Sequence, residues 1–281
     1  MKLIYVFTLL LLLTGKNSQA LSDHNDANKS KLFTIGETGE TCNKGTGYAK
    51  LGLNMVLPTL NLNYAFFNNW EFDFFAIGVP TLKNEEKKEE VGLNIMRYGF
   101  KHHALAHKKF SFVEDYNLSW GLKLHRFKIL LKQQDTTKID KNSWLLIPYL
   151  AQSFKKGNFL YHLYFSVPLG GEKNDAVGVE ENENLTVIFV SGLEYDVSKK
   201  VKLLMEYWYT NLGGFVNFSV SSDQEFSEMY NPDNRFISYM FLGTRLSPFK
   251  RFYTELGIST HYSLPPFPFT GIILNFGWYF R

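Results

Sequence analysis

The last stretch of the chain, residues 269–281, constrains the fold more than any other. Alternate positions there fall into two sets, which is the period of an extended strand. One set is apolar and ends in aromatic residues: Thr270, Ile272, Leu274, Phe276, Trp278 and Phe280. The other set is mostly small or polar: Gly271, Ile273, Asn275, Gly277 and Tyr279. A terminal strand with such an apolar face must bury it against another surface, and lipid is the simplest candidate.

This stretch resembles the final strand of bacterial outer-membrane β-barrels, which carries the recognition signal for insertion. The last residue of those proteins is usually Phe, whereas here Phe280 is penultimate and Arg281 follows it. The resemblance is to the class and identifies no family within it. It implies an all-β fold, a transmembrane antiparallel up-and-down β-barrel, with two partners: outer-membrane lipid and, through the C-terminal strand, the barrel-assembly machinery.

The N-terminus predicts export. Lys2 precedes an apolar run over residues 3–13, and small residues precede an expected cleavage after Ala20. Because the run is too short to cross a bilayer as a helix, it is typical of a secretory signal peptide. We therefore expect a signal peptide over 1–20, a flexible periplasmic arm over 21–44 and an outer-membrane β-barrel over 45–281. The arm is polar and shows no period; a plug or a partner-binding segment is the alternative.

Composition supports strands rather than helices in the membrane. Aromatic residues make up 17% of the chain, yet its mean hydropathy is only −0.18. Alternating strands produce this combination, because every second residue can be polar. The single cysteine, Cys42, excludes an intrachain disulfide. The net charge of +3 does not argue for a nucleic-acid partner.

Alternation recurs along the chain and predicts about twelve strands. We expect them over residues 45–55, 60–66, 70–74, 91–100, 110–131, 143–154, 159–166, 185–197, 201–210, 235–246, 251–260 and 269–281. Short connections near Asn68, Lys156, Lys199 and Pro248 would all fall on the periplasmic side. Longer connections at 81–90, 133–142, 170–184, 211–234 and from His261 would all fall outside. The short connection at Pro58 and the long one at 101–109 fit this pattern less well.

The alternative is an exported soluble β-sandwich or barrel, which alternation alone does not exclude. The number of strands and the size of their apolar faces favour the membrane. So do charged residues that would face the barrel interior, since a soluble barrel would place them on its surface. These candidates for lining the lumen are Glu71, Asp73, Asp115, Lys123, Lys202, Glu206, Arg251 and Glu255.

A small-solute channel or transport barrel is the function that this pattern favours, with no solute indicated. Charges of both signs in the lumen are also explained by a structural ion-pair network, because unpaired buried charge is costly. The alternative function is a non-conducting structural or adhesive barrel that acts through its long loops. Neither function requires a cofactor.

Two further motifs could carry chemistry. The spacing of His102, His103 and His107 could hold a metal, but in a Lys-rich turn solvated histidines are expected. Outer-membrane phospholipases carry a Ser and a His two residues apart with a supporting Asn downstream, and His261, Ser263 and Asn275 have similar spacing. The flanking residues differ and Asn275 falls on the lumen face. We therefore predict no catalytic site and no metal site.

Overall fold

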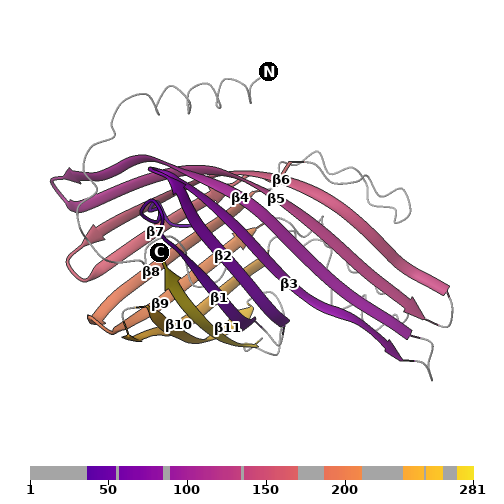
Figure 1. Ribbon diagram of the computed structural model, residues 1–281. Coiled ribbons are helices and arrows are strands. Elements are labelled where there is room, and N and C mark those ends of the chain that lie inside the picture. The colour runs from indigo at the N-terminus through magenta and orange to yellow at the C-terminus, as the bar shows by residue number, and fades with distance from the viewer. Residues whose placement is uncertain are drawn as a thin grey trace, which may run out of the picture.

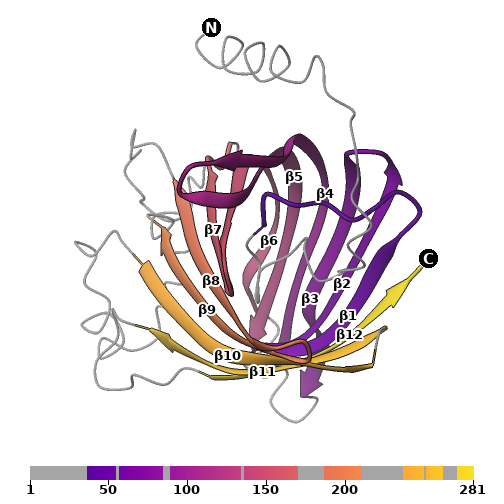
Figure 2. The same ribbon diagram turned by 90° about the vertical axis from the view of Figure 1, so that its left-hand side faces the viewer.

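The computed structural model describes residues 37–54, 57–84, 89–133, 136–169, 187–210, 237–249, 251–261 and 271–281. Within these ranges twelve strands form a closed barrel (Figures 1 and 2). Each strand pairs antiparallel with its neighbours in sequence, and β12 closes the barrel against β1, so the predicted up-and-down barrel is confirmed. The strands are β1 (Gly47–Asn54), β2 (Leu57–Phe67), β3 (Trp70–Asn84), β4 (Glu89–Phe110), β5 (Val113–Gln133), β6 (Thr136–Lys156), β7 (Phe159–Ser166), β8 (Ile188–Ser198), β9 (Val201–Thr210), β10 (Ile237–Phe249), β11 (Phe252–His261) and β12 (Gly271–Phe280). Among the described residues there is no helix with the length and apolar character needed to cross a bilayer.

The terminal strand has the two faces that its sequence predicts. Ile272 and Trp278 are each 59% exposed on the outside of the barrel, whereas Ile273 and Asn275 are buried within it. On the inner face, the ring of Tyr253 covers Gly277, where an added Cβ atom would lie 2.0 Å from that ring. β12 therefore needs a glycine at this position to fit against β11.

Tight turns mark one end of the barrel, which we call the turn end: β1 begins and β12 ends there. The strand bounds leave two residues in each connection at this end: 68–69, 111–112, 157–158, 199–200 and 250–251. Asn69 and Gly157 adopt positive φ angles of 67° and 57°, as tight hairpins require. The long turn that we expected at 101–109 is wrong, because β4 runs through it. The alternation of side chains in this part of β4 is interrupted by irregular pairing with β5 and by a positive φ of 51° at His107.

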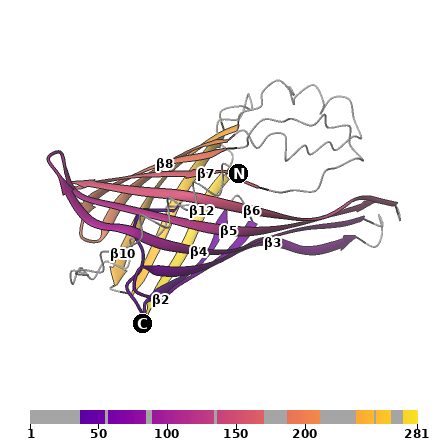
Figure 3. The ribbon, with the colours of Figure 1, turned by 90° about the horizontal axis from the view of Figure 1, so that it is seen from above.

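Four strands, β3 to β6, extend far beyond the others at the opposite end (Figures 1 and 3). They contain 15, 22, 21 and 21 residues, whereas a tilted membrane-crossing strand needs about 9–11. The loops expected at 81–90 and 133–142 are therefore mostly strand, and only 85–88 and 134–135 lie between the strands. Strands that leave the membrane have no lipid-facing side, so their sequence loses its alternation. The expected loops at 170–184 and 211–234 lie outside the described residues.

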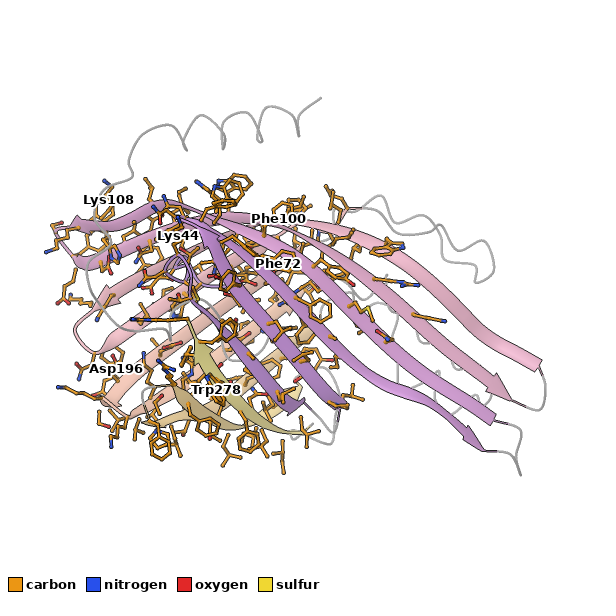
Figure 4. All side chains as sticks on the ribbon, in the orientation of Figure 1. Lys44, Phe72, Phe100, Lys108, Asp196 and Trp278 are labelled. Atoms are coloured by element: carbon orange, nitrogen blue, oxygen red, sulfur yellow. The ribbon has the colours of Figure 1, made fainter. Side chains whose placement is uncertain are left out.

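The barrel has an apolar exterior and a charged interior. Exposed aromatic residues lie close to the turns, as in the girdles of membrane barrels: Phe67, Trp70, Phe110, Phe112, Phe159, Phe249 and Trp278. Figure 4 labels Phe72, Phe100 and Trp278 on this outer surface, and Lys44, Lys108 and Asp196 at the turn end. A soluble barrel would bury such apolar groups and expose its charges, so the structure favours the membrane barrel.

Candidate functional site in the barrel interior

The interior contains residues 37–42, which we call the interior segment. It crosses from the start of β1 towards the opposite wall formed by β5 and β6 (Figure 2). Ser119 Oγ donates a hydrogen bond of 2.6 Å to the Gly39 carbonyl, and Gly39 N–H donates one of 2.7 Å to Ser153 Oγ. Cys42 N–H donates to Glu71 Oε2 at 2.7 Å. This stretch differs from the flexible periplasmic arm that the sequence predicts, because most of its residues are buried inside the barrel. Residues 21–36 of that arm lie outside the described residues.

Gly39 allows the interior segment to approach the wall closely. A Cβ atom at this position would lie 2.3 Å from the carbonyl oxygen of Asn117 and 2.7 Å from the amide nitrogen of Ser153. Both are backbone atoms of barrel strands, which cannot move aside as a flexible side chain could. Any side chain larger than hydrogen at position 39 would therefore displace the segment or distort the wall.

Glu37 is the most enclosed charge of the interior segment. Its carboxylate lies 3.0 Å from Lys123 Nζ and 3.4 Å from Lys101 Nζ, and its side chain is fully buried. Lys123 Nζ also lies 4.7 Å from the ring centres of both Tyr149 and Tyr164. We call Lys101, Lys123, Tyr149 and Tyr164, which β4 to β7 supply, the carboxylate site.

A second pair lies in the same part of the interior. Arg97 of β4 donates to Asp73 Oδ2 of β3 through both Nε, at 3.0 Å, and Nη2, at 2.8 Å. The guanidinium also lies 4.8 Å from the centre of the Phe75 ring. Both charges are buried, so this two-point contact compensates for the water that each has lost.

A larger network joins the walls formed by β1 and β8 to β12. Arg245 lies at its centre, with Nη2 2.7 Å from Glu255 Oε1 and Nη1 3.4 Å from Glu194 Oε1. Lys50 lies 3.3 Å from the other oxygen of Glu255, and Lys202 lies 3.2 Å from Glu194. Because these contacts join β1, β8, β9, β10 and β11, the network ties together strands that are distant in the chain.

Most of the charges selected from the sequence lie in the interior. Glu71, Asp73, Lys123, Glu206 and Glu255 are buried there. Glu206 accepts a hydrogen bond from Trp208 Nε1. Lys202 keeps 21% of its side chain exposed.

The other two selected charges lie near the turns. Asp115 is 3.1 Å from His107 Nδ1 at the turn end. Arg251 is exposed in the β10–β11 turn, outside the interior network.

Sequence reasoning missed several charges of the networks: Glu37, Lys50, Arg97, Lys101, Glu194 and Arg245. A signal existed for several of them, because Arg97 and Lys101 alternate with the exposed Tyr98 and Phe100 along β4, and Lys50 lies beside the exposed Leu51 on β1. Glu37 precedes every strand and has no such pattern, so only its position in the folded barrel reveals it.

The three clustered histidines point in different directions. His102 lies on the outer face, with its ring centre 4.6 Å from that of Trp70 and 5.5 Å from that of Trp120. His103 faces the interior, with Nε2 3.2 Å from Asn117 Oδ1, whereas His107 contacts Asp115. Among the described residues, no group of three or more His, Cys, Asp or Glu side chains is placed to hold a metal.

Asn275, the supporting residue of the phospholipase hypothesis, belongs to the large network. Its side-chain amide donates to Glu255 Oε2 at 2.9 Å inside the barrel. The side chain of His261 and all of Ser263 lie outside the described residues. Asn275 therefore lies inside the barrel, where the sequence places it, and its amide binds the carboxylate of the ion-pair network.

Comparisons with known proteins find similar solved structures but no related sequence. No family model matches the chain, and no curated protein does. The NanC porin is 6% identical, with 84% of this chain and 99% of that chain covered and a TM-score of 0.44. The Ralstonia pickettii toluene transporter TbuX is 6% identical, with 85% and 90% covered and a TM-score of 0.47. A Pseudomonas aeruginosa FadL homologue is 7% identical, with 84% and 88% covered and a TM-score of 0.37.

Such low identities and TM-scores carry no statement about what this chain binds or transports. The class follows from the molecule itself. Its barrel is closed and antiparallel, its large apolar side chains face outward, and its charges are enclosed and paired. The chain is a transmembrane β-barrel of the kind found in bacterial outer membranes.

Proposed function

We propose that this chain is a small-solute transport barrel closed by its own interior segment. The observation that carries the proposal is the burial of Glu37 between Lys101 and Lys123, inside the barrel. A segment in that position obstructs the path along the barrel axis. Passage of a solute would therefore require the segment to move.

The contacts of the interior segment suit a removable closure. Its contacts include side-chain hydrogen bonds and the ion pairs of Glu37, and it is not one of the twelve described strands of the barrel wall. Each such hydrogen bond contributes about 0.5–1.5 kcal/mol net, and about 1.5–3 kcal/mol where a charge takes part. Release would leave the pairing between β1 and β12 unchanged, because that pairing begins only at Gly47.

The second candidate is a non-conducting structural barrel. The large ion-pair network favours it, because Arg245, Glu194 and Glu255 also occupy interior volume and do not belong to the segment. In that case the interior would stay closed to solutes after the segment has left. The two candidates therefore differ in the conductance of a barrel whose segment is displaced.

The test is a Gly39→Val variant in planar lipid bilayers, with Lys44→Ala as the matched control. Lys44 is exposed in the same part of the chain, so its substitution should leave the segment in place. We expect a silent wild type and control, and discrete conductance steps from Gly39→Val. A gel shift between boiled and unboiled samples establishes that each variant has folded.

Cys42 supplies an independent readout of the displacement. It is the only cysteine of the chain and is buried at 9% exposure, so a maleimide should label it slowly in the wild type and rapidly in Gly39→Val. Rapid labelling without conductance would reject the transport proposal and favour the non-conducting barrel.

A further inference from the structure

We propose that the carboxylate site binds the carboxylate group of a small organic acid, and that Glu37 occupies this site in the closed barrel. This inference rests on the proposed function, because a solute would reach the site when the interior segment leaves. Glu37 comes from outside the barrel wall, whereas Lys101, Lys123, Tyr149 and Tyr164 all belong to it. In the closed barrel, the wall therefore binds a carboxylate that belongs to the interior segment.

Lys123 gives the site its preference for an anion. Among the described residues, Glu37 is the one carboxylate within ion-pair distance of its ammonium group. When Glu37 leaves, Lys123 keeps the hydroxyl oxygen of Tyr164, 3.5 Å away, and the rings of Tyr149 and Tyr164, but has no carboxylate within ion-pair distance among the described residues. Because an unpaired buried charge is costly, another carboxylate should take the vacated position.

Tyr149 contributes its ring, and not its hydroxyl group, to the site. Its side chain is 5% exposed and packs over Gly121, where an added Cβ atom would lie 2.3 Å from Cζ and 2.4 Å from the hydroxyl oxygen of Tyr149. The hydroxyl group does not donate to Glu37, although that carboxylate fills the site, so a ligand carboxylate in the same position would be held by Lys123.

The aromatic walls indicate the rest of the ligand. The rings of Tyr149 and Tyr164 lie 5.3 Å apart between centroids and flank the ammonium group of Lys123. A flat apolar group attached to the carboxylate could pack against such ring faces. The site therefore suits an organic acid with a compact apolar body more than an inorganic anion, and benzoate is a suitable probe.

The experiment measures benzoate binding to the Gly39→Val protein in detergent by isothermal titration calorimetry. Benzamide is the neutral probe of the same shape. We expect benzoate to bind at least about tenfold more tightly than benzamide. Adding Lys123→Met to Gly39→Val should weaken benzoate binding by a similar factor, about tenfold or more. The wild type, with Glu37 in the site, should not bind benzoate.

Lys202→Met in the Gly39→Val background is the matched control. It removes the same charge from the other network, so benzoate affinity should stay within about twofold. Equal affinity for benzoate and benzamide, or binding that survives Lys123→Met, would overturn the inference. If Gly39→Val fails the gel-shift test of folding, Glu37→Ala replaces it, because this variant vacates the carboxylate position without adding volume elsewhere.

The outcomes separate this inference from the proposed function. Conductance without benzoate binding would reject the carboxylate site and leave the transport barrel standing. Benzoate binding without conductance would support the site and reject transport. If the variant both conducts and binds benzoate, benzoate should reduce the current through Gly39→Val, and Lys123→Met should abolish that block.

Discussion

At the scale of single residues, stability inside the barrel depends on how charges are paired. Arg245 contacts two carboxylates, Glu255 and Glu194, which come from different strands. Without the guanidinium, Glu255 would keep Lys50 and Glu194 would keep Lys202, but both buried acids would lose the partner that they share. Losing one partner of a buried ion pair costs more than the pair contributes, because the remaining charge stays buried.

The substitution Arg245→Met should therefore reduce the free energy of unfolding by about 3–5 kcal/mol. Arg251→Met is the matched control, because Arg251 is exposed in the adjacent turn, and its effect should stay within about 0.5 kcal/mol. Urea titration of protein refolded in lipid vesicles, followed by tryptophan fluorescence, measures both. Similar effects from the two substitutions would show that the network contributes little to stability.

At the scale of elements, the barrel combines two kinds of strand. Strands such as β9, β11 and β12 have 10 residues each, which matches the length of a membrane crossing. β4, β5 and β6 have about twice that length, and their outer parts pair with one another and with the end of β3. The extension is thus a sheet continued beyond the bilayer, and the membrane-crossing part should fold without it.

Replacing residues 129–141 by an Asn-Gly turn, which joins Lys128 to Asn142 across an existing register pair, tests this division. We expect the shortened chain to refold in detergent and to keep the gel shift between boiled and unboiled samples. Its urea midpoint should change little, because the buried networks lie elsewhere. Failure to refold would show that the extension helps to form the barrel.

At the scale of the whole molecule, the distribution of apolar and charged groups is the reverse of that in a soluble protein. Leu256 lies in the middle of β11 with 56% of its surface exposed, whereas its neighbour Glu255 is fully buried. Such an exterior is stable only against lipid or detergent. Lipid contact therefore belongs to the fold itself, whereas recognition by the barrel-assembly machinery, the signal peptide and the absence of a nucleic-acid partner stay predictions.

An arginine on the lipid-facing side should be costly in proportion to its depth. We expect Leu256→Arg, at mid-strand, to reduce the free energy of unfolding in vesicles by about 2–4 kcal/mol. Phe249→Arg, beside a turn, should cost only about 0–1 kcal/mol. Equal and small effects of both substitutions would instead indicate that the outer surface faces water.

The sequence by itself determined the class of fold. Alternation is a local property, since neighbouring side chains of a strand point to opposite sides, and β12 shows it from Ile272 to Phe280 without knowledge of its partners. For the same reason, buried charges such as Glu71, Asp73 and Glu255 could be selected from their strands alone. Alternation did not predict the part of β4 around His107, because irregular pairing interrupts the period there. It also did not predict the extended ends of β3 to β6, because they have no lipid-facing side.

Only the tertiary structure decided which charges meet and what occupies the interior. Lys50 and Glu255 lie at opposite ends of the chain and become partners when β12 closes against β1. Glu37 lies before every strand, and its contacts with Lys101 and Lys123 depend on a segment that folds back into the finished barrel. Local patterns carry no information about such contacts, because closure of the barrel brings together residues that no period in the sequence relates.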